Sequence, residues 1–241
     1  MESEGESAVF KRVLIKVSGE ALMGPDQFGI HSPTVQSICS QIGEIRQLSV
    51  DVGIVVGGGN IFRGLKAAER GMERVTADNM GMLATVINSL AMMDTLEQMG
   101  IFTRVMSAVN LSDFAEPYIR RRAIRHLEKG RLVIFAAGTG NPYFSTDTAA
   151  SLRATEIGAQ LVIKATNVDG VYSADPRKHD DAEFIPRLTY QEVLTRRLRV
   201  IDSTAVSLLM DNHIPVRVID LNRPGNLKRV ILGHEVGSLI S

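Results

Sequence analysis

The sequence is poor in cysteine, and it has neither a long apolar run nor an excess of charge of one sign. Cys39 is the only cysteine among 241 residues, which excludes an internal disulfide framework and fits a reducing compartment. No apolar stretch approaches the roughly 20 residues of a membrane-spanning helix. The 27 basic residues are balanced by 27 acidic ones, which argues against a general nucleic-acid-binding protein. We therefore expect a cytoplasmic protein that requires no membrane and no nucleic acid.

The sequence also lacks the patterns of several common enzyme classes. It contains no G-x-x-x-x-G-K-[ST], and neither of its glycine-rich segments completes G-x-G-x-x-G. A P-loop and a dinucleotide-binding Rossmann site are therefore unsupported. The five histidines are scattered, so no zinc site is indicated. No set of nucleophile, base and orienting group is recognisable for a hydrolase.

Apolar runs alternate with helical patterns along nearly the whole chain. Continuous apolar strands are typical of a sheet covered on both faces, so the order predicts a three-layer α/β/α sandwich around a mainly parallel sheet. Predicted strands are 13–17, 52–56, 101–106, 132–137, 160–165, 215–219 and 237–240; predicted helices are 32–48 (capped by Ser32), 76–99, 115–129, 148–157 and 202–210, with short ones near 189–192 and 227–231.

The domain organisation follows from composition. The segment 1–9 begins with small and acidic residues and lacks the basic and apolar regions of a signal peptide. It is predicted to be a flexible tail. No linker-like segment divides residues 10–241, which are predicted to form a single domain.

Two helical segments have unusual surfaces. The helix predicted over 76–99 is rich in methionine and alanine and apolar over much of its surface, so it lies in the core or in a subunit interface. The run Arg120–Arg122, with Arg125, is interpreted as a solvated basic face.

The most informative segment is 138–147, with the sequence GTGNPYFSTD. It joins the apolar run 132–137 to the helix predicted from residue 148. The chain here is therefore predicted to form a strand, then a glycine-rich turn, then the start of a helix. Helix N-termini carry unpaired N–H groups and suit anions. By itself the segment fits both a capped helix, with Ser145 or Thr146 as the cap, and a loop that binds a phosphate or another oxygen-rich ligand.

Three further predicted strand ends carry glycine or charge: Lys16–Gly19, Gly57–Asn60 and Thr166–Gly170. The carboxyl ends of parallel strands are where such sheets bind ligands, and glycines let backbone N–H groups approach phosphates closely. Lys16 and Arg63 are suited to neutralise charge on a transferring phosphoryl group. Asp147 is suited to hold Mg²⁺, directly or through water, or to orient Lys16. Together these residues predict phosphoryl transfer by positioning and electrostatics.

These motifs resemble the amino acid kinase superfamily. The resemblance rests on KVSGE from Lys16, VGGGN from Val56, FRG from Phe62 and KATNVDGVY from Lys164. Within that superfamily, DNMGMLAT from Asp78 and the segment 138–147 resemble bacterial uridylate (UMP) kinases, in order from about residue 10 to the C-terminus. The resemblance implies an α/β/α fold and ATP-dependent phosphorylation of UMP to UDP, with Mg²⁺, in pyrimidine nucleotide biosynthesis. It also implies a homohexamer built from dimers.

The resemblance further implies roles for individual residues. It makes Lys16, Arg63 and Asp147 catalytic, with Asp147 organising the metal. ATP is expected to contact Lys16, Val17, Ser18, Gly19, Gly59, Arg63, Thr166, Tyr172 and Asp175. UMP is expected to contact Gly58, Asp78, Thr139, Gly140, Asn141, Pro142, Tyr143, Phe144, Ser145 and Thr146. The acceptor-binding lobe then covers about residues 10–160 and the ATP-binding lobe about residues 161–241.

Regulation is a further expectation from the resemblance. It places a GTP-responsive allosteric region at Gly24, Pro25, Asp26, Gln27, Phe28 and Gly29, with GTP and UTP as effectors. Asn167 stands where many relatives carry lysine, which removes one charge near ATP.

Two other functions use some of the same parts. A kinase for a carboxylate or carbamate would share Lys16 and Gly57–Gly59 but would lack the segment 138–147 in this form. A nucleotide-sensing protein without catalysis is the other alternative, and the intact Lys16, Arg63 and Asp147 argue against it.

Overall fold

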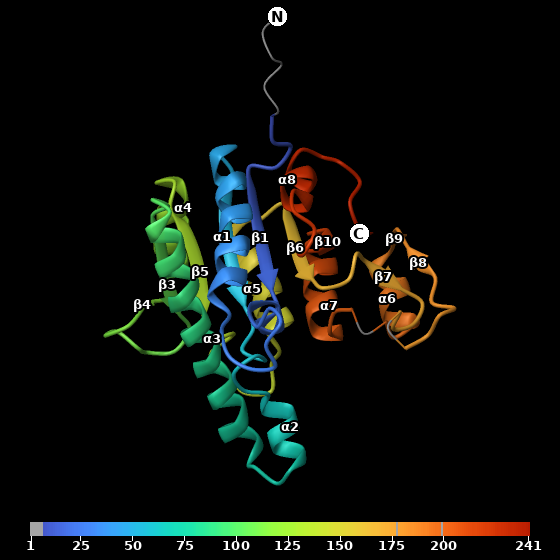
Figure 1. Cartoon of the computed structure of the whole chain (residues 1–241), viewed down its shortest axis with the longest axis horizontal. Coiled ribbons are helices and arrows are strands. Elements are labelled where there is room, and N and C mark those ends of the chain that lie inside the picture. Colours follow the sequence, from blue (N-terminus) through green and yellow to red (C-terminus); the bar gives the residue numbers. More distant parts are fainter. Residues whose placement is uncertain (1–6, 177, 199) are drawn as a thin grey trace, which may run out of the picture.

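A nine-stranded sheet forms the middle layer of the computed structural model, which describes residues 7–176, 178–198 and 200–241 (Figure 1). The strands are β1 (Arg12–Val17), β2 (Asp51–Val56), β3 (Thr103–Ser107), β4 (Glu116–Pro117), β5 (Leu132–Ala136), β6 (Leu161–Thr166), β9 (Arg187–Leu188), β10 (Val216–Asp220) and β11 (Ser238–Ile240). Their spatial order is β4-β3-β5-β2-β1-β6-β10-β11-β9. Neighbouring strands are parallel except β10 and β11. A separate antiparallel pair joins β7 (Val171–Tyr172) to β8 (Phe184–Ile185).

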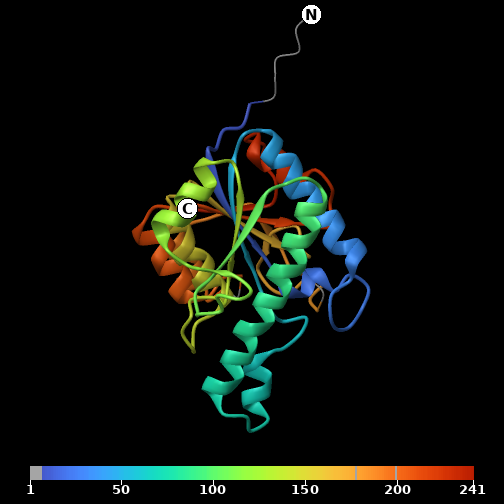
Figure 2. The same cartoon turned by 90° about the vertical axis from the view of Figure 1, so that its left-hand side faces the viewer.

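Helices cover both faces of this sheet. They are η1 (Gly19–Leu22), α1 (Ser32–Gln47), α2 (Gly64–Glu69), α3 (Arg74–Gln98), α4 (Arg120–Glu128), α5 (Thr146–Ile157), α6 (Tyr190–Thr195), α7 (Ser203–Asp211) and α8 (Asn226–Ile231). On one face, α1 packs against α3 and α8, and on the other α5 packs against α4 and α7 (Figure 2). The predicted α/β/α sandwich around a mainly parallel sheet is confirmed.

Alternation along the central strands separates two apolar cores. In β1, Val13, Ile15 and Val17 join the core that contains α1, α3 and α8 residues, whereas Leu14 joins the core with α4, α5 and α7 residues. Successive side chains of a strand point to opposite faces, so the position after Ile15 faces the α5 side. Cys39 lies in the first core, where burial raises the pKa of its thiol to about 12.

Several predicted boundaries were wrong for local reasons. The helix predicted from residue 115 begins at Arg120, because Glu116–Pro117 pairs with β3 as an edge strand, a place where proline is tolerated. The helix predicted from residue 76 begins at Arg74, because the Glu73 carboxylate caps it. Ser32 is the first helical residue rather than the cap of α1. The short helix α2 was not predicted.

The helix rich in methionine has one buried and one exposed side. Met92 and Leu96 are buried in the core, whereas Met80, Leu83 and Ile87 are exposed. α2 and the first turns of α3 extend away from the sheet together (Figures 1 and 2). Arg120, Arg121, Arg122 and Arg125 are all exposed, as the sequence predicted. None of the helices in the described part of the chain is long and apolar enough to span a membrane.

Candidate functional site

Four strand ends meet at one edge of the sheet. β5, β2, β1 and β6 are consecutive neighbours in the sheet and run parallel. The segments after them are 138–145, 57–63, 18 onward and 167–170. The glycine-rich and charged segments that the sequence singled out therefore lie side by side.

The loops after β1 and β2 are in close contact. Gly57 donates its backbone N–H to the Val17 carbonyl over 2.9 Å. A Cβ added to Gly19 would lie 2.7 Å from the Gly57 oxygen and the Gly59 nitrogen, so only glycine allows this approach. Beneath the loop, buried Asn88 donates to the Gly57 carbonyl over 2.7 Å and pairs with the Asn60 amide. The glycine loop is thereby fixed to both β1 and α3.

Two lysines converge on one carboxylate at the centre of this edge. Lys16 on β1 and Lys164 on β6 are direct partners in the parallel register. Lys164 Nζ donates to Asp147 Oδ2 over 2.5 Å, and Lys16 Nζ lies 2.9 Å from Asp147 Oδ1. The sequence prediction included Lys16 and Asp147 but missed Lys164. The signal for it was a charged residue in an otherwise apolar strand, on the same face as Lys16 by alternation.

The electrostatics of the cluster keep Asp147 ionised. Burial alone would raise its pKa, but the ion pairs with Lys16 and Lys164 outweigh burial and lower the pKa to about 2. Burial, together with the neighbouring Lys16 charge, lowers the pKa of the Lys164 ammonium below its usual value although Asp147 raises it. Asp147 Oδ1 is buried, and the Lys16 ammonium is its partner among the described interactions.

The start of α5 is held by a network around Ser145. The Ser145 hydroxyl accepts hydrogen bonds from the backbone N–H groups of Asp147 and Thr148, over 3.0 and 3.1 Å, and so caps the helix. It donates to Asp202, which also accepts from the Thr148 hydroxyl over 3.0 Å and caps α7. The sequence predicted either Ser145 or Thr146 as the cap of this helix, and the structure shows that the cap is Ser145. Asp202 was not among the predicted site residues.

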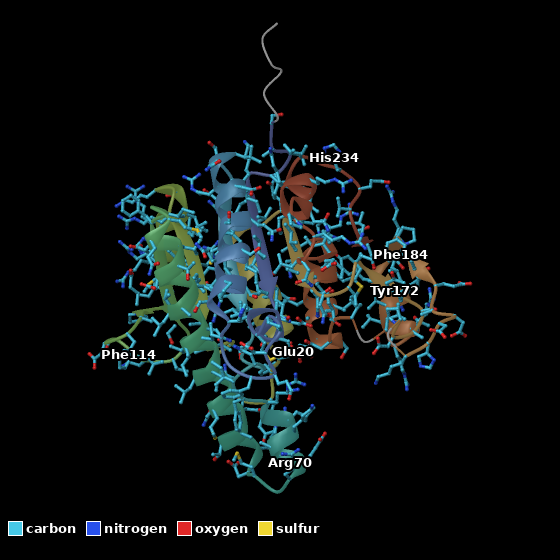
Figure 3. The ribbon with its side chains drawn as sticks, viewed as in Figure 1. Glu20, Arg70, Phe114, Tyr172, Phe184 and His234 are labelled. Atoms are coloured by element: carbon cyan, nitrogen blue, oxygen red, sulfur yellow. The ribbon has the colours of Figure 1, made fainter. Side chains whose placement is uncertain are left out.

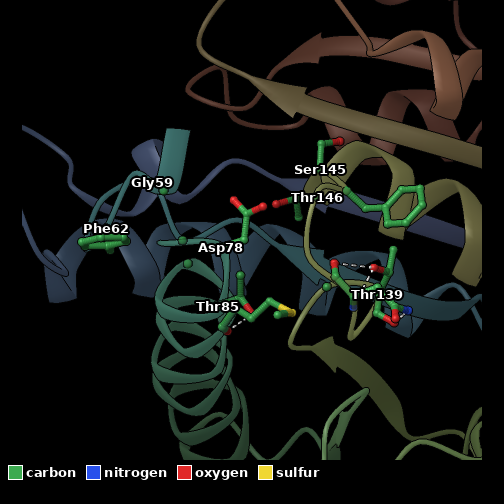
Figure 4. A pocket seen from close by; sticks show the side chains of 14 residues that line it. Gly59, Phe62, Asp78, Thr85, Thr139, Ser145 and Thr146 are labelled. Atoms are coloured by element: carbon green, nitrogen blue, oxygen red, sulfur yellow. Dashed lines mark hydrogen bonds between the residues drawn. The ribbon is translucent and has the colours of Figure 1, made fainter. Parts of the chain in front are cut away.

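A cavity of about 240 Å³ opens between α3 and the segment after β5 (Figure 4). Predicted residues in its lining are Gly58, Gly59, Asp78, Thr139, Asn141, Phe144, Ser145 and Thr146. Gly140, Pro142 and Tyr143 belong to the same segment but do not line it, while Phe62, Gly64, Gly81, Met82, Thr85 and Gly138 line it without having been predicted. The signal for the α3 residues was their spacing, since positions 78, 81, 82 and 85 share one helix face.

Arg63 lies at the end of the glycine loop. Its Nε donates to the Gly59 carbonyl over 3.1 Å, and its guanidinium pairs with Glu20 at 2.6 Å. Glu20 belongs to η1, which begins at Gly19, the last of the predicted residues 16–19, and is capped by Ser18. Arg63 therefore joins the loops after β1 and β2 near the cavity without lining it.

The remaining predicted residues lie at the end of β6 and beyond it. The Thr166 hydroxyl donates to the Val168 carbonyl over 2.8 Å and holds the turn. The Tyr172 hydroxyl donates to Asp169 over 2.6 Å, and its ring packs edge-to-face on Phe184 (Figure 3). The Asp175 carbonyl accepts the backbone N–H of Lys178 over 2.9 Å. β6, from whose end these residues follow, is separated by β1 from β2 and β5, whose following loops line the cavity.

The predicted effector loop, residues 24–29, contacts the glycine loop. Gly29 donates its N–H to the Asn60 carbonyl over 2.9 Å, and the Asn60 amide donates to the Gly29 carbonyl over 2.8 Å. Phe28 at the tip of the loop is 68% exposed. The loop is thus exposed at its tip and attached at its base to the segment Gly57–Asn60.

Comparisons with known proteins agree with this geometry. A family model described as the amino acid kinase family matches residues 11–220. The UMP kinase from Bacillus anthracis is 40% identical, with a TM-score of 0.93 and 96% of each chain covered. The UMP kinase from Ureaplasma parvum is 36% identical, with a TM-score of 0.89, covering 96% of this chain and 98% of that one. The uridylate kinase from Archaeoglobus fulgidus is 29% identical, with a TM-score of 0.74, covering 95% and 99%.

Proposed function

The chain belongs to the amino acid kinase family, and from this premise we propose that it is a UMP kinase, which transfers the γ-phosphoryl group of ATP to UMP and yields ADP and UDP. The observation that carries this proposal is the placement of segment 138–147. Its first part lines the cavity with Asp78, and its last residue holds the two lysines. The likeness to UMP kinases over almost the whole chain supports the same substrate.

The chemistry follows from position and charge. The acceptor is a phosphate oxygen that already carries negative charge, so no strong general base is needed once donor and acceptor are aligned. Lys16 and Lys164 stand side by side, and their pairing with Asp147 keeps both ammonium groups directed to this edge. Lys16 neutralises charge on the transferring group, Arg63 acts on the phosphates from the glycine loop, and Asp147 orients the lysines.

The site suits a Mg²⁺ ion that is bound mainly by the nucleotide and not by a cluster of protein ligands. The described residues contain no group of three histidine, cysteine, aspartate or glutamate side chains that would hold a metal. Asp147 is an ionised carboxylate at the centre of the charge cluster, which suits it to contact Mg²⁺ through a water. Bound in this way, Mg²⁺ would neutralise charge on the phosphates of ATP. Removing Mg²⁺ with a chelator is expected to abolish turnover, and activity retained without any divalent cation would rule out this role.

The two nucleotides occupy opposite sides of the lysines in this proposal. UMP takes the cavity, with Asp78 on the ribose hydroxyls and Asn141 with the rest of segment 139–146 around the base and phosphate. ATP takes the side of β6, with Val17, Ser18, Gly19 and Gly59 at its phosphates and Thr166, Tyr172 and Asp175 at its adenosine. Residues 10–160 then form the acceptor lobe and residues 161–241 the ATP lobe of one domain. Structures with UMP and an ATP analogue would show both placements, and exchanged sites would contradict them.

Regulation and assembly are further parts of the proposal. The attachment of residues 24–29 to Asn60 supports GTP and UTP as effectors that act through this loop. Rates unchanged by either nucleotide would rule that out.

The exposed apolar residues Met80, Leu83 and Ile87 support a hexamer built from dimers. Light scattering is expected to give the mass of six chains, and a monomer would contradict it. We place the enzyme in the cytoplasm, in pyrimidine nucleotide biosynthesis.

The acceptor preference tests the function. Purified protein is expected to consume ATP with UMP far faster than with CMP, AMP or small carboxylic acids. Hydroxylamine, which traps acyl phosphates, separates this reaction from phosphorylation of a carboxylate. No turnover of UMP, or trapped hydroxamate with a carboxylate acceptor, would refute the proposal. Tight binding of UMP and ATP with no transfer would indicate a nucleotide sensor instead.

A further inference from the structure

One oxygen of the Asp78 carboxylate is shared by two donors from different parts of the chain. Asp78 Oδ2 accepts a hydrogen bond from Arg74 Nε over 2.8 Å, one turn earlier on α3. It also accepts the backbone N–H of Tyr143 over 2.8 Å, from a loop 65 residues away in the sequence. The guanidinium carbon of Arg74 lies 5.3 Å from the centroid of the Tyr143 ring. Arg74, Asp78 and Tyr143 therefore form a closed set of three contacts, which we call the latch.

Tyr143 is turned away from the cavity that its neighbours line. Asn141 and Phe144 line the cavity, whereas Tyr143 does not, and Tyr143 is 65% exposed. Its backbone has a φ of +70°, a left-handed conformation that is unfavourable for a residue with a side chain. Contacts outside the loop must hold such a conformation, and the described contacts of Tyr143 that do so are those with Arg74 and Asp78.

The other carboxylate oxygen of Asp78 remains available. Asp78 lines the cavity, and its carboxylate faces Thr146 across it (Figure 4). A Cβ added to Gly64 would lie 3.1 Å from Asp78 Oδ1, so a glycine at this position leaves room beside that oxygen. The carboxylate is thus divided between the latch, through Oδ2, and the cavity, through Oδ1.

We propose that Arg74 is a positioning residue for the acceptor nucleotide, which closes the segment 139–146 over the cavity through the latch. This rests on the proposed function, because it assigns the cavity to UMP. Arg74 holds the Asp78 carboxylate in one rotation and holds the loop against α3 through the Tyr143 ring. Both effects act on the acceptor side alone, since Lys16, Lys164 and the turns beyond β6 have no contact with the latch among the described interactions.

The test compares the change in KM for UMP with the change in KM for ATP when Arg74 is replaced. Arg74→Leu is expected to raise KM for UMP about tenfold, because a charge-assisted hydrogen bond and a cation–π contact are lost, with KM for ATP and kcat changed less than about twofold. Arg74→Lys keeps the charge but not the planar group and is expected to recover part of the loss. Arg125→Leu is the matched control, since Arg125 forms an exposed ion pair with Glu128 on α4 and all constants should stay at their wild-type values.

A double-mutant cycle separates the latch from a general structural effect. Tyr143→Ala keeps the backbone N–H but removes the ring, and it is expected to raise KM for UMP in the same way. If both residues act through the latch, Arg74→Leu combined with Tyr143→Ala will raise KM by less than the product of the single effects. Three results would overturn the inference: a KM for UMP in the double variant equal to the product of the single effects, an unchanged KM for UMP in Arg74→Leu, or an equal rise of the KM for ATP in that variant. Failure of the wild-type protein to phosphorylate UMP would instead overturn the proposed function.

Discussion

Asp147 is the residue on which the charges of the site depend. Its carboxylate lies between two ammonium groups, at 2.9 Å from Lys16 and 2.5 Å from Lys164. Removing one partner of a buried ion pair leaves the other charge uncompensated, which typically costs about 3–5 kcal/mol. The same change removes the group that orients both lysines. Stability and turnover are therefore linked through this one side chain.

Asp147→Asn tests that link. We expect turnover to fall by about a hundredfold or more and the free energy of unfolding to fall by about 3 kcal/mol, measured by steady-state kinetics and urea unfolding. The exposed Asp113, changed to asparagine, is the matched control and should alter neither quantity. Turnover close to that of the wild type in Asp147→Asn would remove the residue from the proposed mechanism.

The lowered pKa of Asp147 predicts how stability depends on pH. Its ordinary value is 3.8 and its value in the folded protein is about 2, so the folded state binds this proton less readily than the unfolded state. The stabilisation is present in full above about pH 5 and amounts to roughly 2 kcal/mol. It is lost as the pH falls toward 2, because the folded state must then take up the proton.

Urea unfolding at several pH values measures this loss. The difference in unfolding free energy between the wild type and Asp147→Asn should be constant from about pH 6 to 5 and should shrink by about 1 kcal/mol on going to pH 3. Using the difference between the two proteins cancels the titration of the other carboxylates. A difference that stays constant or grows below pH 4 would show that Asp147 is not held ionised by the lysines.

At the scale of elements, the start of α5 connects helix capping with the site. The Ser145 hydroxyl caps α5 and donates to Asp202, which caps α7. Two helix N-termini are therefore fixed to each other next to Asp147. Loss of a serine cap typically costs about 1 kcal/mol, and here it also leaves Asp202 without one of its donors.

Ser145→Ala is expected to lower both stability and turnover. The unfolding free energy should fall by about 1–2 kcal/mol, and kcat should fall by about tenfold, because the backbone that carries Asp147 is less well fixed. Thr189→Ala is the matched control, since Thr189 caps α6 in a capping box away from the site. It should lower stability by about 1 kcal/mol and leave kcat unchanged. Equal effects of the two variants on kcat would contradict a role of the cap in positioning Asp147.

The elements also show how far sequence patterns reach. Apolar runs and helical spacing predicted the central strands, and the capping chemistry of Ser145 was readable because a serine precedes a helical pattern. The predicted start of α4 was wrong because residues 116–117 pair with β3 at the edge of the sheet. No local sequence pattern reveals this pairing. Lys164 and Asp202 were missed for a similar reason. Their importance depends on the register of β1 and β6 and on the contact of α7 with α5, both of which arise only in the folded chain.

At the scale of the whole molecule, the order of strands arranges the site. The cavity lies over the ends of β5 and β2, the two lysines stand on β1 and β6, and the residues proposed for the adenosine of ATP follow from the end of β6. Acceptor, charge cluster and donor side thus follow one another along a single sheet edge. The latch closes the far end of this row, at the projecting part of α3 (Figure 1).

Competition among acceptors for ATP is the most direct test of the central claim. UMP, CMP and AMP, each isotopically labelled in the nucleoside, are mixed at equal concentration with unlabelled ATP and Mg²⁺, and the labelled diphosphates are separated and counted, so that ADP made from AMP is distinguished from the ADP left by ATP. Their ratio equals the ratio of kcat/KM values, which is the measure of specificity. The account predicts UDP in at least about a hundredfold excess over CDP and ADP formed from AMP, and no UDP with Lys16→Ala. Comparable amounts of the three diphosphates, or UDP at the wild-type rate from the Lys16 variant, would contradict it.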